Sequence, residues 1–205
     1  MTQAPSAKPD HQRPELPDFW DKRFSAGATP WDHGRAPAEL EALLPPPGSA
    51  TPPRILVPGC GHAREAAWLD QRGWAVTALD FAPAAIAAAR EVLGEWGGEL
   101  RCADFFDFPV AAPYDVVYER AFLCALPRKL WPGYGPRAAE LVRPGGYLAG
   151  FFFFSDEPKG PPFGIGAAEQ EALLSPWFER MVDAPAQAPI PVFAGGERWQ
   201  VWRRR

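Results

Sequence analysis

The sequence has little cysteine, and its cysteines do not form the pairs that metal sites and disulfide frameworks use. Of the 205 residues only three are cysteine, at Cys60, Cys102 and Cys124. They form no Cys-x-x-Cys pair, and an odd number of widely spaced cysteines argues against a disulfide framework. We therefore expect no metal site, and we expect a protein of the reducing cytoplasm.

A long apolar run is also missing. The longest, YLAGFFFF at 147–154, is far shorter than the roughly 20 residues that a helix needs to cross a bilayer, and it favours a buried strand. The N-terminus is polar and rich in proline, without the apolar core of a signal peptide. These absences predict no membrane partner.

Positive charge is not in excess either. The net charge is -4, and only the tail 203–205 is a run of arginines, which is typical of a solvated terminus. Nucleic-acid binding over a whole domain needs a basic surface. We therefore expect no nucleic-acid partner.

Apolar segments of two kinds alternate along the chain and are separated by loops that hold many of the 26 prolines. Residues 1–17 are expected to be a flexible lead, and residues 18–205 a single domain. Strands are predicted at 54–57, 75–80, 100–103, 114–119 and 147–154. Helices are predicted at 62–72, 84–93 and 128–142, the last interrupted near Pro132 and Gly133. Short helices are predicted at 18–24, with Asp18 as its N-cap, and at 36–44, and a helix and two strands, the last at 198–204, should follow Gln170.

This alternation predicts an α/β fold with a mostly parallel sheet, helices on both faces and an antiparallel C-terminal edge. Ligands of such sheets bind beyond the carboxyl ends of the strands. Strand 54–57 ends at the turn Pro58-Gly59-Cys60-Gly61, where glycine lets the backbone approach a ligand closely.

The turn departs from two nucleotide-binding fingerprints. Gly59 and Gly61 fill the first two places of Gly-x-Gly-x-x-Gly, but Arg64 stands at the third, which counts against NAD and FAD. No Gly-Lys-Ser/Thr follows, so the turn is not a P-loop. We interpret Cys60 as a small buried residue.

Two acids follow the next two strands. Asp80 ends strand 75–80 and is placed either to accept hydrogen bonds from both ribose hydroxyls or to cap the next helix. Asp104 is placed either to accept from an adenine amino group or to form a turn. Phe105 adds an apolar wall for an adenine ring, and Phe81 is a further candidate for cofactor binding. A nucleoside without phosphates fits this set, and S-adenosylmethionine is such a ligand.

Five stretches resemble the thiopurine S-methyltransferase family of class I S-adenosylmethionine-dependent methyltransferases, including its plant-type halide/thiol branch. They are FWDKRFSAGATPWDHGR (19–35), ILVPGCG (55–61), YDVVYERAFLCALP (114–127), KGPPF (159–163) and GGERWQVW (195–202). The resemblance implies a Rossmann-like, seven-stranded class I methyltransferase fold, and we expect a monomer. It also implies S-adenosylmethionine as cofactor, with S-adenosylhomocysteine as product, and a small-molecule methyl acceptor.

The resemblance further implies that residues 18–45 cover the cofactor. Trp20, Phe24 and Trp31 would form that cover, since a sulfonium cation is attracted to aromatic faces, although ordinary core packing would also explain them. Phe24 stands where relatives usually have tryptophan.

The residues after strand 114–119 face the transferred methyl group in class I enzymes. Here Glu119 and Arg120 form the acid–arginine pair of thiopurine-type relatives, in which the arginine contributes to the cofactor and substrate sites. Arg198 falls where relatives place a basic residue near the substrate. Arg120 and Arg198 would together hold an anionic acceptor, or Arg198 would form a surface ion pair.

A soft nucleophile such as a thiolate needs little acid–base help. His62 is expected to open the helix after the turn, and Asp32 or His33 is a candidate base for a thiol. The sequence predicts methyl transfer to a thiol, thiopurine, thiocyanate, halide or selenium species. A metalloid oxyanion acceptor such as tellurite, a cofactor-binding regulator without turnover, and a nicotinamide oxidoreductase are the alternatives.

Overall fold

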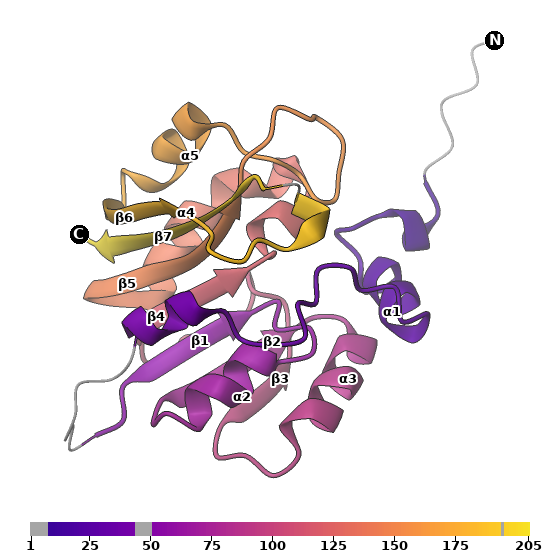
Figure 1. Cartoon of the computed structure of the whole chain (residues 1–205), viewed down its shortest axis with the longest axis horizontal. Coiled ribbons are helices and arrows are strands. Elements are labelled where there is room, and N and C mark those ends of the chain that lie inside the picture. Colours follow the sequence, from indigo (N-terminus) through magenta and orange to yellow (C-terminus); the bar gives the residue numbers. More distant parts are fainter. Residues whose placement is uncertain (1–7, 44–50, 194) are drawn as a thin grey trace.

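A computed structural model describes residues 8–43, 51–193 and 195–205. Seven strands form one sheet (Figure 1). They are β1 (Arg54–Pro58), β2 (Ala75–Asp80), β3 (Glu99–Cys102), β4 (Tyr114–Arg120), β5 (Val142–Phe153), β6 (Phe178–Pro185) and β7 (Glu197–Arg204). The helices are α1 (Pro17–Ser25), α2 (Arg64–Asp70), α3 (Pro83–Leu93), α4 (Trp131–Leu141) and α5 (Ala167–Leu174).

The strand order is β3-β2-β1-β4-β5-β7-β6. Strands β1 to β5 pair in parallel, whereas β7 pairs antiparallel with both β5 and β6. The chain leaves β1 for β2 on one side and returns to β4 on the other, so the order reverses next to β1. This topology confirms the predicted fold and its antiparallel C-terminal edge.

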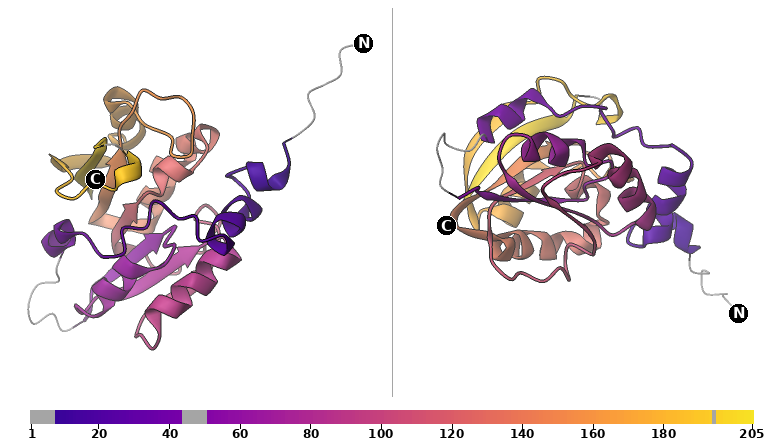
Figure 2. Two further views of the ribbon diagram at one scale, coloured as in Figure 1. Left: turned by 45° about the vertical axis from the view of Figure 1, so that its right-hand side comes forward. Right: turned by 90° about the horizontal axis from the view of Figure 1, so that it is seen from below.

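The sheet separates two apolar cores. Helices α2 and α3 pack with Ile55 on one face, and α4 and α5 pack with Leu56 on the other (Figures 1 and 2). These neighbouring residues of β1 are both fully buried, because successive side chains of a strand point to opposite faces. A strand covered on both faces needs a continuous apolar run, which β1 has, and burying one such side chain stabilises the fold by roughly 1.5–3 kcal/mol.

Several predicted element ends were wrong for local backbone reasons. Helix α2 begins at Arg64 and not at residue 62, because Gly61 and Ala63 adopt φ values of +52° and +57° that no helix contains. The helix predicted at 128–142 is a 3-10 turn at Arg128–Leu130 followed by α4 from Trp131, and Pro132 lies in the first turn of α4, where the missing N–H costs nothing. The segment predicted as a helix at 36–44 is a 3-10 turn at Ala38–Leu43, and Leu44 lies outside the described residues.

Two further boundaries also differ. The residue that precedes α1 is Leu16, and no side chain caps the helix, so Asp18 lies within its first turn. Strand β5 begins at Val142 instead of residue 147, because its first residues extend the pairing with β4 across an irregularity.

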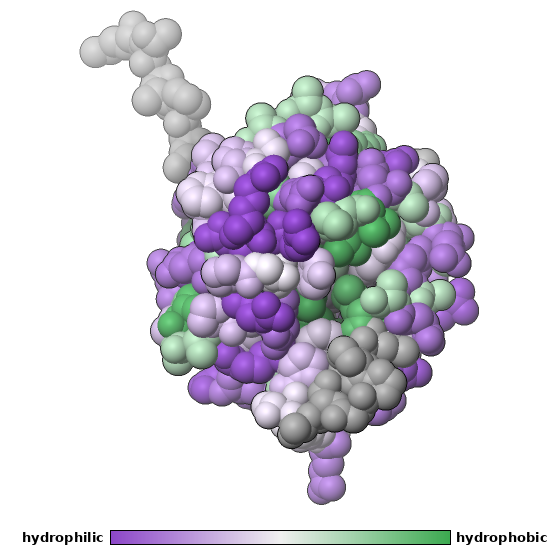
Figure 3. All heavy atoms as spheres, turned by 90° about the vertical axis from the view of Figure 1, so that its left-hand side faces the viewer, coloured by the Kyte–Doolittle hydropathy of each residue, from purple (hydrophilic) through white to green (hydrophobic). Residues whose placement is uncertain are grey.

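The face at the amino ends of the parallel strands is mostly hydrophilic, with apolar residues gathered in small patches (Figure 3). No helix in the described part of the chain is long and apolar enough to cross a membrane.

Candidate active site

A cavity of about 720 Å³ lies where the parallel strands end, and residues of α1 line it. This volume is in the range of roughly 300–1,000 Å³ that small-molecule sites occupy. The predicted residues that line it are Trp20, Phe24, Trp31, Gly59, Gly61, Asp80, Phe81, Asp104, Phe105 and Arg120. The predicted residues outside its lining are Asp32, His33, Pro58, Cys60, Glu119 and Arg198.

The turn after β1 is closely packed against the residues that follow β4. Gly59 has φ +59°, and a Cβ added to it would lie 2.4 Å from the Phe122 ring. Gly61 has φ +52°, and its Cβ would be 3.5 Å from Phe24. Only glycine therefore fits the first position and lets the backbone border the cavity. Between them Cys60 is buried, and burial raises the pKa of its thiol well above the ordinary value.

Asp80 holds this turn at the end of β2. One carboxylate oxygen accepts from the Gly61 amide at 3.1 Å, and the other accepts from the Ala82 amide at 3.0 Å, just before α3. Burial raises the pKa of Asp80 to about 6, against the effect of these two hydrogen bonds. Asp80 therefore fixes the start of α3 and also presents a carboxylate to the cavity.

After β3, Asp104 accepts from the Phe106 amide at 2.8 Å, which forms a local turn while Asp104 still lines the cavity. Phe105 is buried and packs almost parallel to Tyr134, with ring centroids 5.8 Å apart. These two residues place an acid beside an apolar wall.

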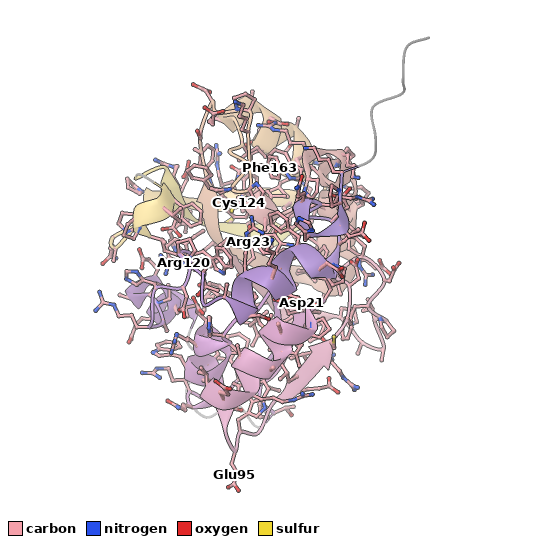
Figure 4. The ribbon with its side chains drawn as sticks, turned by 90° about the vertical axis from the view of Figure 1, so that its right-hand side faces the viewer. Asp21, Arg23, Glu95, Arg120, Cys124 and Phe163 are labelled. Carbon is pink, nitrogen blue, oxygen red and sulfur yellow. The ribbon has the colours of Figure 1, made fainter. Side chains whose placement is uncertain are left out.

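Aromatic rings from the N-terminal segment meet over the glycine turn. The ring centroids of Trp20 and Trp31 lie 5.5 Å apart in an edge-to-face contact. The centroid of the Phe24 ring lies 6.0 Å from that of Trp31 and 5.4 Å from that of His62. Asp21, labelled in Figure 4, anchors α1 by accepting from the first turn of α3, at 2.7 Å from the Ala84 amide. The segment predicted to cover the cofactor thus lies across the cavity.

Asp32 attaches this segment to α2. Its carboxylate accepts from Arg64 Nε at 2.9 Å and lies 3.1 Å from His62 Nδ1. Partial burial opposes ionisation, but the Arg64 hydrogen bond holds the pKa of Asp32 below its ordinary value. An acid so stabilised as the anion is a weak base. His33 Nε2 is buried without a hydrogen-bond partner in the described structure, and it does not line the cavity.

The turn after β4 contains a strained residue, since Ala121 has φ +59°. Glu119 supports this turn from below by accepting from the amides of Phe122 and Leu123 at 3.0 and 3.4 Å. Burial, together with the nearby Glu197 carboxylate, raises the pKa of Glu119 to about 8. Glu119 is therefore placed to shape the turn, whereas Arg120 and Ala121 reach the cavity.

Arg120 forms a buried ion pair with Glu197. Its Nε donates to one Glu197 oxygen at 2.9 Å and its Nη2 to the other at 3.1 Å. The neighbouring Arg198 instead pairs with Asp183 of β6 at 2.6 Å, away from the cavity, so the structure does not bring it to Arg120.

Three contributors were missed from sequence. Glu197 shares a face of β7 with the buried Trp199 two residues on, and that alternation was the available signal. Phe122 lies within the stretch 114–127 but had no assigned role. Arg64 was noted only as a missing glycine, although it anchors the cover through Asp32.

Comparison with known proteins gives a consistent result. The family model for thiopurine S-methyltransferase matches residues 16–205. A probable thiol methyltransferase of Arabidopsis thaliana is 29% identical over 191 residues, covering 90% of this chain and 84% of that protein. A thiopurine S-methyltransferase of Xanthobacter autotrophicus is 30% identical over 195 residues, covering 85% of this chain and 90% of that protein.

The fold is also found among solved structures. A 1,6-didemethyltoxoflavin-N1-methyltransferase of Burkholderia thailandensis, with 1,6-didemethyltoxoflavin and S-adenosylhomocysteine bound, is similar with a TM-score of 0.74. The match covers 99% of this chain and 93% of that chain at 21% identity, which shows a shared fold.

Proposed function

This chain belongs to the thiopurine S-methyltransferase family and is an S-adenosylmethionine-dependent methyltransferase of sulfur-type acceptors, and we propose that its acceptor is a small, soft nucleophile. Thiols, thiopurines, thiocyanate, halides and selenium species belong to that class. The observation that carries the proposal is one cavity that joins the glycine turn, Asp80 and Arg120 below an aromatic cover.

The residues of the cavity fit the cofactor. The bare backbone of Gly59 and Gly61 gives room for the amino-acid part, and Asp80 supplies the acceptor for ribose hydroxyls. Asp104 and Phe105 offer an acceptor and an apolar wall to the adenine. When bound, S-adenosylmethionine supplies an electrophilic methyl group on a sulfonium.

The cover would stabilise that sulfonium and keep water out. The faces and edges of Trp20, Phe24 and Trp31 converge above the glycine turn, and a cation near aromatic faces gains about 0.5–2 kcal/mol. Water excluded from the site cannot compete with the acceptor.

Apolar side chains stand beside Arg120 in the cavity. Phe122, Leu126 and Phe193 line it together with Arg120, whose guanidinium is a hydrogen-bond donor. Neither Asp32 nor His33 lines the cavity, so the candidate bases proposed from sequence are not placed beside an acceptor. Such a site favours acceptors that are already nucleophilic at neutral pH and need mainly alignment.

Isothermal titration with S-adenosylmethionine and S-adenosylhomocysteine tests cofactor binding, and labelled S-adenosylmethionine with thiols, thiopurines, thiocyanate, iodide and selenite tests transfer. We expect micromolar-range binding and a methylated product from at least one soft acceptor. Binding without any product would leave the chain a regulator, and a folded protein that binds neither ligand would refute the proposal.

We also propose that the enzyme acts as a monomer in the cytoplasm on a small molecule, and not on nucleic acid or at a membrane. The net charge of -4 supports the absence of a nucleic-acid partner. Light scattering during size exclusion tests the monomer.

A further inference from the structure

The guanidinium of Arg120 is held on one of its two hydrogen-bonding edges. The Nε and Nη2 atoms bind both oxygens of Glu197, and the two side chains are only 4% and 1% exposed. This two-point geometry is the strongest that an arginine and a carboxylate form. The Nε–Nη2 edge could otherwise bind a planar or tetrahedral oxyanion, but here the Glu197 carboxylate occupies it.

The remaining contacts of Arg120 use its face and part of its second edge. Its guanidinium carbon lies 4.3 Å from the centroid of the Phe151 ring, and Nη2 also donates to the Ala188 carbonyl at 3.2 Å. In the described part of the chain, Nη1 is buried without a hydrogen-bond partner. Arg120 lines the cavity, and Nη1 is the guanidinium nitrogen whose hydrogen-bonding capacity the described residues leave unused.

Glu197 is itself held in place. Glu197 is the first residue of β7 and pairs with Phe153 at the end of β5. Because β7 runs antiparallel to β5, the start of β7 lies at the edge of the sheet where β4 and β5 end. One of its oxygens also accepts from the Ile190 amide at 2.8 Å, just before Val192 and Phe193, which line the cavity. The carboxylate therefore joins Arg120 to the wall of the acceptor side.

We propose that Glu197 is a positioning residue that closes the forked edge of Arg120 and limits the methyl acceptor to one contact at Nη1. This inference rests on the proposed methyl transfer and narrows its substrate class. Thiols, thiocyanate and halides are satisfied by one donor. Oxyanions such as sulfate, selenite or tellurite depend on the two-point edge, which Glu197 occupies, so selenite is removed from the proposed acceptor class while selenols remain in it.

Substitution of Glu197 by glutamine tests the proposal. Glu197→Gln keeps the size of the side chain but removes its charge, so the buried Arg120 cation loses its counter-charge and attracts a competing anion. Sulfate is titrated into the protein loaded with S-adenosylhomocysteine, at constant ionic strength. We expect sulfate to bind about tenfold more tightly to Glu197→Gln than to the wild type, because charge-assisted contacts to Arg120 are regained.

The matched control is Glu179→Gln, which breaks the exposed pair between Glu179 and Arg203 of β7. Sulfate affinity should not change in this variant. In parallel, sulfate should become a stronger inhibitor of methylation by Glu197→Gln for whichever of thiophenol, thiocyanate and iodide is methylated fastest. A residue that only supports folding would lower turnover without any gain in sulfate affinity.

Sulfate affinity within about twofold of the wild type in folded Glu197→Gln overturns the proposal. If Glu197→Gln does not fold, Glu197→Asp keeps the charge but is too short to hold both nitrogens, and an unchanged sulfate affinity there has the same meaning. Tight sulfate binding by the wild type, in competition with the acceptor, also overturns it. Failure of the wild type to bind cofactor or form product would instead refute the proposed function.

Discussion

Asp80 connects the protonation of one side chain to cofactor binding. Its pKa lies at about 6 because of burial, and only the ionised form accepts from two ribose hydroxyls. We expect the affinity for S-adenosylmethionine to fall as the pH is lowered from about 7 to about 5, since the site must then lose a proton to bind. Isothermal titration across this range measures the effect.

Asp80→Asn is the matched variant. It should bind S-adenosylmethionine about tenfold or more weakly at pH 7.5, about the loss of one hydrogen bond to a charged group, and show little pH dependence between 5 and 7. An equal slope in both proteins would show that another group is responsible.

Gly59 is irreplaceable for two separable reasons, its positive φ and its contact with Phe122. We expect Gly59→Ala to lower the free energy of unfolding by about 2–5 kcal/mol, from backbone strain of about 1–2 kcal/mol and overpacking of about 1–3 kcal/mol. Gly73 also has a positive φ but no atom within 4 Å of an added Cβ, so Gly73→Ala should show the strain alone. Urea unfolding compares the two, and equal losses would contradict the contact with Phe122.

At the scale of elements, two carboxylates of the cover hold it against the helices of the sheet domain. Asp21 accepts a hydrogen bond from the Ala84 amide in the first turn of α3, and Asp32 accepts one from Arg64 at the start of α2. The pKa of Asp32 is lowered, so its stabilising contribution is complete above the ordinary pKa of an aspartate and is lost only when the pH falls through the lower value. The attachment of the cover therefore persists at the pH at which Asp80 titrates.

Arg64→Ala should release the cover without unfolding the protein. The pair with Asp32 is one-third exposed on the arginine side, so we expect a loss of unfolding free energy below about 1 kcal/mol. S-adenosylhomocysteine should nevertheless dissociate severalfold faster, because the aromatic rings are less firmly held over it. Stopped-flow tryptophan fluorescence measures this rate.

Arg72→Ala is the control, since Arg72 follows the same helix and its side chain contacts Trp68. Equal dissociation rates for Arg64→Ala and the wild type would remove Arg64 from this role.

The sequence was a good guide to elements and a weaker one to side-chain direction. Continuous apolar runs such as β1 predicted the strands to within a few residues, since burial on both faces leaves a clear pattern. The start of α2 was missed because positive φ at Ala63 leaves no mark in hydrophobicity. Arg198 was favoured over Glu197 because the motif gives a position along the strand, whereas the alternation of β7 with the buried Trp199 puts Glu197 on the buried face.

For the molecule as a whole, buried acids make stability depend on pH. Glu119 has a pKa of about 8 because of burial, well above its value in an unfolded chain, so the folded state holds a proton that the unfolded state has lost. Stability should therefore fall as the pH rises from about 5 to about 8, at on the order of 1 kcal/mol per pH unit while only the unfolded state is ionised. Asp80 has the same sign, but its effect ends near its pKa of about 6.

Thermal unfolding of the wild type and Glu119→Gln checks this. The variant should lose the slope above about pH 6 and keep the part that belongs to Asp80. A wild-type stability that rises between pH 6 and 8 would contradict the burial of an unpaired Glu119.

The position of β7 has a consequence for how the protein is made. It follows β6 in the chain but lies between β5 and β6 in the sheet, so the ribosome completes both neighbours before the strand that separates them exists. The carboxylate that pairs with Arg120 belongs to Glu197, which is synthesised 77 residues later. Because synthesis adds only about 5–20 residues per second, seconds pass between the synthesis of Arg120 and that of Glu197, and this ion pair can form only when β7 is inserted.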